Sequence, residues 1–308
     1  FSFNYFDAGA ITLHARKTVA ANSPEPAVEL TGSSNSFATR PFAFHLEVAG
    51  EPSATDGSGT KYRKAGENFD VTLRPVIYES GDDANTNSDL ANNALTPNFG
   101  SHNGISLNLG HSLQAPTGIG VSGGVLSGWS NQSVIFNNTG RKGEYQFGTL
   151  SWSEVGVISM SAEHSDYLGS GESIAGNRPN VGRFYPDHFD VLANNGSFAN
   201  TCNLGANPFT YIGQGFTYGT APSLTITAKN LSGGTTENYT DSNFMKLVLS
   251  DITRVFPNAD VDQNGADNTT LMRVGTSLNA GETLTATGAG MMTYLFDATD
   301  IYSYTKDD

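Results

Sequence analysis

A short segment near the start of the chain returns 147 positions later (154 − 7 = 147). In both copies an acidic residue stands two positions before a glycine, and apolar residues then recur at every second position. The two copies are Phe6–Arg16 and Ser153–Glu163. Alternation with period two after a glycine is the pattern of a half-buried β-strand entered through a turn or bulge. Because the pattern returns at a domain-sized distance, it indicates tandem modules.

Further segments repeat at nearly the same distance. Gly66 and Phe69 are matched by Gly213 and Phe216, again 147 positions on (213 − 66 = 147). An alternating segment follows in each copy and predicts a strand. An aromatic-rich strand precedes it in each copy, at a distance of 143 (183 − 40 = 143). The alternating segments are Phe69–Leu73 and Leu224–Ala228, and the aromatic-rich ones are Arg40–Val48 and Arg183–Val191.

The composition favours an all-β protein with many turns. Of 308 residues, 35 are glycine, 18 phenylalanine and 12 tyrosine, while charged residues make up only 15%. Such a chain is too apolar and aromatic for disorder and too poor in Lys, Glu, Ala and Leu for a helical protein. Short strands separated by turns are typical of β-sandwiches. We therefore predict two tandem immunoglobulin-like β-sandwich modules preceded by an extra N-terminal strand.

Composition shifts predict where the modules begin and end. Residues 1–37 are expected to hold a strand of a preceding or partner module and a polar, proline-containing linker. Module 1 is expected over residues 38–168, a linker rich in Gly, Ser and Asn over 169–180, and module 2 over 181–308. Within module 2, residues 244–249 fit a short helix or, better, a buried strand.

Module 2 shows no clear counterpart of the Asp-Ala-Gly strand before Asp308. Two interpretations stay open. The simpler one is a longer array that continues past this point. In the other, residues 1–16 complete the second module of a neighbouring molecule by β-strand addition, because unpaired strand edges invite such pairing.

The net charge is −14 and the pI about 4.7. An acidic surface repels phosphate backbones, so we expect no nucleic-acid partner. It suits extracellular surroundings and divalent cations. Cys202 is the only cysteine, which excludes an internal disulfide and predicts a buried, inert thiol or one that pairs outside the chain. No apolar run is long enough to cross a bilayer, so no membrane span is expected.

Four segments carry a resemblance to a known family: Tyr5–Arg16, Arg40–His45, Gly182–Val191 and Phe209–Gln214. They resemble the uncharacterised C-terminal region of MSHA-biogenesis MshQ-like proteins, which are large bacterial surface proteins encoded with mannose-sensitive haemagglutinin type IV pili. The resemblance implies a pilus- or surface-associated role in a Gram-negative bacterium, with other modules of the same protein or pilus components as partners. It supplies no catalytic residues and no lectin activity.

The strongest candidate for a metal site is the loop that begins at Asp260. Asp260, Asp262 and Asn264 place oxygen ligands at alternate positions before a glycine, as calcium loops do, and Asp267 is a further ligand candidate. Leu271 stands where an EF-hand needs a bidentate Glu. A calcium loop of another type and a plain turn rich in Asp and Asn both stay open. Residues 82–89 alternate oxygens in the same way without a glycine, which favours a solvated loop.

Three motifs have catalytic residue types, and none predicts an active site. Ser122 lies in a Gly-x-Ser-x-Gly match, but a nucleophile elbow needs a strand before it and a helix after it. His45 and His188 occupy nearby positions in the two repeats, which favours a structural role such as a hydrogen bond to a loop carbonyl. Asp187 and Asp190 form a possible carboxylate pair, but residues three apart in a strand point to opposite faces. We expect no enzyme.

The aromatic residues are expected to build the core rather than a sugar-binding platform. This applies above all to Trp152, which directly precedes the repeated strand, whereas Trp129 would stack on sugars if exposed. The other aromatic residues expected in the core are Phe42, Phe44, Phe184, Tyr185 and Phe189.

The leading hypothesis is a non-enzymatic structural or adhesive segment of a bacterial cell-surface or type IV pilus-associated protein, stiffened by Ca²⁺ if the loop at Asp260 binds it. One alternative is a carbohydrate-binding or carbohydrate-active module that recognises host or surface glycans. Another is a self-assembling fibre subunit that donates its N-terminal strand.

Overall fold

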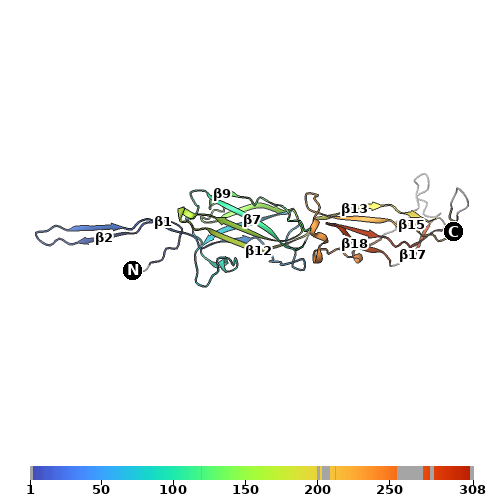
Figure 1. Cartoon of the computed structure of the whole chain (residues 1–308), viewed down its shortest axis with the longest axis horizontal. Helices are drawn as coiled ribbons and strands as arrows, with labels where there is room; N and C mark the ends of the chain where they lie inside the picture. The colour runs from blue at the N-terminus through green and yellow to red at the C-terminus, as the bar shows by residue number, and fades with distance from the viewer. Residues whose placement is uncertain are drawn as a thin grey trace. The chain divides into compact units, whose positions relative to one another are not determined.

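The computed structural model describes residues 3–118, 120–199, 202, 209–211, 213–254, 273–277 and 281–305 (Figure 1). The chain divides into two compact units. Unit 1 comprises Phe1–Thr117 and Gly123–Phe184, and unit 2 comprises Gly118–Ser122 and Tyr185–Asp308. In the described ranges the regular structure is antiparallel strands and five short 3₁₀ turns, which confirms the all-β prediction. The turns are η1 (Asp89–Asn92), η2 (Tyr167–Gly169), η3 (Glu237–Thr240), η4 (Ser242–Phe244) and η5 (Leu249–Asp251).

Unit 1 contains two four-stranded antiparallel sheets. The first has the order β5-β6-β10-β8, and the second has the order β12-β11-β7-β9. The strands of the first are β5 (Ala43–Val48), β6 (Asn68–Val76), β8 (Leu126–Ser127) and β10 (Tyr145–Trp152). Those of the second are β7 (Ile105–Ala115), β9 (Gln132–Val134), β11 (Gly156–His164) and β12 (Ile174–Phe184).

The core of unit 1 lies between these two sheets. Phe44 and Leu46 of β5 are fully buried and belong to one apolar cluster with Ile158 and Met160 of β11. Unit 1 is therefore a β-sandwich. Its strand order is consistent with an immunoglobulin-like fold, apart from the chain order of the short strands β8 and β9.

Unit 2 repeats the first sheet of unit 1. Its four-stranded sheet has the order β13-β16-β19-β18, and its buried residues include Ile226, Met292 and Tyr294. The strands of that sheet are β13 (His188–Asn194), β16 (Ser223–Lys229), β18 (Thr283–Gly288) and β19 (Met291–Leu295). Two-stranded sheets are formed by β14 (Ser197–Phe198) with β15 (Tyr218–Thr220) and by β17 (Arg273–Ser277) with β20 (Ile301–Thr305).

The repeat extends to the hydrogen bonds of one turn. In unit 1 the N–H of Glu67 donates to the Lys64 carbonyl at 2.9 Å, and the Glu67 carboxylate accepts the N–H of Lys64 at 3.0 Å. In unit 2 the N–H of Gln214 donates to the Tyr211 carbonyl at 3.0 Å, and the Gln214 side chain accepts the N–H of Tyr211 at 3.1 Å. The glycine inside each turn has a positive φ, 86° and 79°, which only glycine adopts easily.

Module 2 has a closing strand, β20 (Ile301–Thr305), although its sequence shows no clear Asp-Ala-Gly motif. It follows Phe296-Asp297-Ala298, which repeats Phe6-Asp7-Ala8. Thr299 replaces the glycine of the motif, so a search for Asp-x-Gly misses this copy.

Both predicted linkers carry strands instead. Within residues 1–37, β2 (His14–Val19) pairs with β3 (Val28–Ser33), and β1 (Gly9–Ile11) pairs with β4 (Phe37–Thr39). Residues 169–180 include most of β12, whose Ile174 is fully buried. Polar residues with proline in 1–37, and Gly, Ser and Asn in 169–180, hide the strand pattern in these segments.

Two predicted strands differ from what the structure shows. The strand expected over 183–191 is broken, because β12 ends at Phe184 and β13 begins at His188. The buried strand expected over 244–249 is absent from this described stretch. There Phe244 is buried, while the Tyr239 hydroxyl accepts the backbone N–H groups of the two residues 246 and 247, so no neighbouring strand binds them.

Candidate functional site

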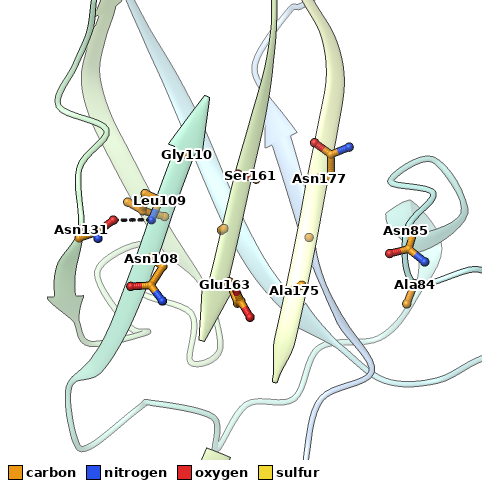
Figure 2. A pocket seen from close by; sticks show the side chains of 12 residues that line it. Ala84, Asn85, Asn108, Leu109, Gly110, Asn131, Ser161, Glu163, Ala175 and Asn177 are labelled. Atoms are coloured by element: carbon orange, nitrogen blue, oxygen red, sulfur yellow. Dashed lines mark hydrogen bonds between the residues drawn. The ribbon is translucent and has the colours of Figure 1, made fainter. Parts of the chain in front are cut away.

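A cleft of about 430 Å³ lies on the outer face of the second sheet of unit 1 (Figure 2). Two rows of outward side chains cross three strands. One row is Asn177, Ser161 and Gly110, and the other is Ala175, Glu163 and Asn108, each row joined by cross-strand pairing. The rest of the lining is Ala84, Asn85, Leu109, Asn131, Ala162 and Gly176.

The cleft is hollow because its floor is built from small residues. A Cβ added to Gly110 would meet the Ser161 hydroxyl oxygen at 2.8 Å, so glycine keeps the middle of the cleft open. The side wall is held in place by Asn131, whose Oδ1 accepts the backbone N–H of Leu109 at 2.8 Å. The Gly110 carbonyl in turn accepts the indole N–H of Trp129 at 2.9 Å from the core side.

The lining offers hydrogen bonds and little else. Asn85, Asn108 and Asn177 supply amide donors and acceptors at exposed positions, and Glu163 adds one carboxylate. None of the residues that line this cleft is aromatic. Such a surface suits a polar, hydroxyl-rich ligand held by hydrogen bonds, without the ring stacking that many sugar sites use.

Side-chain oxygens of the loop over residues 82–89 accept hydrogen bonds from the protein itself. The Asp83 carboxylate accepts the N–H of Asn85 at 2.9 Å, and the Asp82 carboxylate accepts the Asn93 amide at 2.7 Å. Across the ranges that the structure covers, no group of three His, Cys, Asp or Glu side chains is placed to hold a metal ion. The predicted calcium ligands Asp260, Asp262, Asn264 and Asp267 lie outside the described residues.

A smaller cavity of about 360 Å³ lies beside this loop, where buried His45 meets Arg74 and Arg178. Burial, followed by the nearby Arg74 cation, lowers the pKa of His45 below its ordinary 6.5. The Nδ1 of His45 meets no hydrogen-bond partner among the described residues. The arginines are paired, since Arg178 contacts Glu51 at 2.5 Å and Arg74 contacts Glu144 at 3.0 Å. The predicted hydrogen bond from His45 to a loop carbonyl is not made by Nδ1.

His188 is placed differently from His45, although the two occupy nearby repeat positions. It is exposed, and its Nδ1 lies 2.8 Å from an Asp187 carboxylate oxygen. Its Nε2 lies 3.7 Å from Asp190, so the two candidate carboxylates meet at one imidazole. This grouping holds the imidazole between two carboxylates at the start of β13.

Ser122 and Cys202 were the two other candidate residues, and neither lies in a catalytic arrangement among the described residues. The backbone N–H of Ser122 donates to the Asn238 side chain at 2.7 Å, and Asn238 donates back to the Ser122 carbonyl at 2.8 Å. Residues 123–134 are described and contain no helix, so Ser122 does not lie in a nucleophile elbow. Cys202 carries a free, half-buried thiol, which differs from the expected buried one, and pairing outside the chain stays a prediction.

The aromatic prediction holds in the core and fails at its rim. Trp129, Trp152, Phe44 and Phe184 are buried, which removes both tryptophans as sugar platforms. Phe42 and Tyr185 are half-buried, and Phe189 is exposed.

Sequence reasoning missed the cleft. Its residues come from segments between positions 84 and 177, and no local motif joins them. The available signal was the recurrence of Asn at outward positions of strands, where asparagine is uncommon.

These features define the chain as an all-β protein of tandem antiparallel units built on one repeated plan. Two models of the DUF6701 family match it, the second domain over residues 40–148 and the third domain over residues 154–307. The chain therefore belongs to the DUF6701 family. Neither a curated protein nor a solved structure matches it. Over the described residues, no helix has the length and apolar character needed to cross a membrane.

Proposed function

We propose that this chain is a non-enzymatic structural and adhesive segment of a bacterial cell-surface or type IV pilus-associated protein of the MshQ-like kind. The observation that carries the proposal is the repeat, because two units share a sheet order and a hydrogen-bonded turn. Tandem β-sandwich modules hold binding loops at a distance from the cell, and their stiffness comes from packed sheets.

Unit 1 has features that support a load-bearing role. Strand β11 is paired along both edges, with β12 and with β7, so separating it requires breaking two ladders at once. The buried Glu144 carboxylate binds both Arg74 and Arg141, at 3.0 and 2.9 Å. Both features raise the number of contacts that must break together.

The test is an in-frame deletion of residues 40–307 from the chromosomal gene of a Gram-negative bacterium that encodes this chain. We expect antibodies against unit 1 to label intact wild-type cells, and we expect the deletion to reduce attachment to surfaces without changing growth. Absence of labelling on intact cells, or unchanged attachment, would contradict the proposal.

The cleft supports a second candidate, a carbohydrate-binding module. Its amides and single carboxylate complement neutral sugar hydroxyls. On a glycan array, the purified chain should then bind at least one glycan, and the double change Asn108→Ala and Asn177→Ala should remove that binding. Asn35→Ala, a change at an exposed asparagine outside the cleft, is the matched control. Equal glycan binding by both variants would exclude the cleft as the glycan-binding site.

The third candidate, a fibre subunit that donates residues 1–16, has less support. Ala8 belongs to the core cluster of unit 1, and the Asp7 carboxylate accepts the N–H of Asn98 at 3.0 Å. Removing residues 1–16 should abolish polymerisation if this candidate is right, while polymers formed by the truncated chain would exclude it.

A further inference from the structure

The hairpin β2–β3 is a ribbon of two strands, and no third strand from the described part of the chain pairs with it (Figure 1). Every residue of both strands is exposed. An isolated two-stranded hairpin is marginally stable in water, and its free edges and faces are available for pairing. One face carries Ala15, Lys17, Val19, Val28 and Leu30, whereas the opposite face carries the Arg16–Glu29 ion pair at 2.6 Å.

This hairpin is a second copy of the β11–β12 hairpin of unit 1. In β11–β12, Ala162 pairs with Gly176 and Glu163 pairs with Ala175. In β2–β3, Ala15 pairs with Gly32 and Arg16 pairs with Thr31. The first strands correspond at the repeat distance of 147 (162 − 15 = 147). A glycine of the repeated motif also opens β11 and the strand β1 that precedes β2, with φ of 144° at Gly156 and 151° at Gly9.

The surroundings of β11–β12 show what such a hairpin binds. One edge of β11 pairs with β7, and the inward face of the hairpin, with Ile158, Met160 and Ile174 fully buried, closes the sandwich over the first sheet. Gly176 lies against β5, because a Cβ there would overlap the Phe44 carbonyl oxygen and the Leu46 side chain. A side chain at this position would separate the two sheets.

The corresponding residues of β2–β3 have no packing partner among the described residues. Nothing lies within 4 Å of a Cβ built on Gly32. Leu13, the counterpart of buried Met160 (160 − 13 = 147), is 42% exposed, and Leu30, the counterpart of buried Ile174, is 56% exposed. The hairpin β2–β3 therefore has the same inward face as β11–β12, but no described β-sheet covers that face.

We propose that β2–β3 is the closing hairpin of another β-sandwich unit of the DUF6701 family and docks on that unit as β11–β12 docks on unit 1. The matching models are those of a second and a third domain, so the family includes a further domain, and we take this domain as the occupant. Its counterpart of β7 pairs with the edge of β2, and its counterpart of β5 covers Gly32. The proposal goes beyond the adhesive role and can fail while that role stands.

Hydrogen exchange tests the proposal with two proteins, the 308-residue chain and the same chain with the first domain of a DUF6701 protein joined ahead of Phe1. We expect the amides of residues 14–19 and 28–33 to exchange rapidly in the chain alone. In the longer protein they should exchange about 100-fold more slowly, since docking adds a ladder and excludes water. Unchanged exchange in the longer protein would overturn the proposal.

Two matched variants separate docking from hairpin folding. Gly32→Val places a side chain on the inward face, and Thr31→Val places the same side chain on the outward face of the adjacent position. Both should leave the unfolding of the chain alone unchanged, because the hairpin touches no core. In the longer protein, Gly32→Val should remove the added protection and Thr31→Val should keep it.

Equal behaviour of the two variants would contradict docking through this face. Concentration-dependent dimerisation of the 308-residue chain that Gly32→Val abolishes would assign the face to a second copy of the chain, which would also overturn the proposal. Sedimentation of the chain and of both variants distinguishes these outcomes.

Discussion

The side chain of Asn87 pairs with the backbone of Leu46 as a neighbouring strand would. Its Oδ1 accepts the N–H of Leu46 at 2.8 Å, and its Nδ2 donates to the Leu46 carbonyl at 3.0 Å. Leu46 lies on β5, whose other side pairs with β6. One buried amide therefore closes part of an open sheet edge and holds the loop over residues 82–89 against it.

Replacing Asn87 should destabilise unit 1. Asn87→Ala removes two buried hydrogen bonds and leaves the Leu46 N–H and C=O without partners, which costs about 2–3 kcal/mol. Denaturant unfolding followed by tryptophan fluorescence measures this loss, because Trp129 and Trp152 both lie in the core of unit 1. Asn85→Ala, at an exposed position of the same loop, should change stability by less than about 1 kcal/mol. An equal loss in both variants would contradict the role of Asn87.

The two motif glycines should respond differently to the same substitution. Gly9 and Gly156 share a φ that is costly for any other residue, about 1–3 kcal/mol. A Cβ at Gly156 would also overlap the Ala115 carbonyl oxygen, whereas a Cβ at Gly9 meets nothing within 4 Å. Thermal unfolding should therefore show a larger loss for Gly156→Ala than for Gly9→Ala. The reverse order would contradict the arrangement of β11 against β7.

Stability should fall on mild acidification because of His45. Its pKa is lowered in the folded chain, so below pH 6.5 the unfolded chain binds the proton more readily than the folded one. The stabilisation is complete above that pH and is lost as the pH falls toward the folded pKa. Between pH 7 and 5, His45→Gln should lose stability less steeply than the wild type. His14→Gln, at an exposed position, should keep the wild-type slope.

Calcium provides a test of the loop at Asp260. If that loop binds Ca²⁺, adding the ion should raise the unfolding temperature in proportion to the logarithm of its concentration, and EDTA should reverse the shift. The double change Asp260→Asn and Asp262→Asn should remove the response. An unfolding temperature that is the same in calcium and in EDTA would show that residues 260–268 form a plain turn and bind no calcium.

Much of the repeat was predictable because it depends on local patterns. The glycines at 66 and 213 permit one turn, and alternating segments such as Phe69–Leu73 became strands. Segments without that alternation were misassigned. Residues 174–180 belong to β12 although Gly, Ser and Asn dominate the stretch 169–180, and the facing sheet leaves room only for glycine at position 176.

The sequence by itself determined the all-β class, the tandem repeat and the burial of Phe44, Trp152 and Phe184. These depend on the spacing of residues along one strand, and that spacing is visible in the chain. Only the tertiary structure decided which outward residues meet. Strand register brings Asn108, Glu163 and Asn177 to one cleft. The packing of β11–β12 on the facing sheet shows that its copy β2–β3 lacks such a sheet. Alternation shows which face a residue occupies, whereas its neighbours on that face depend on pairing between distant segments.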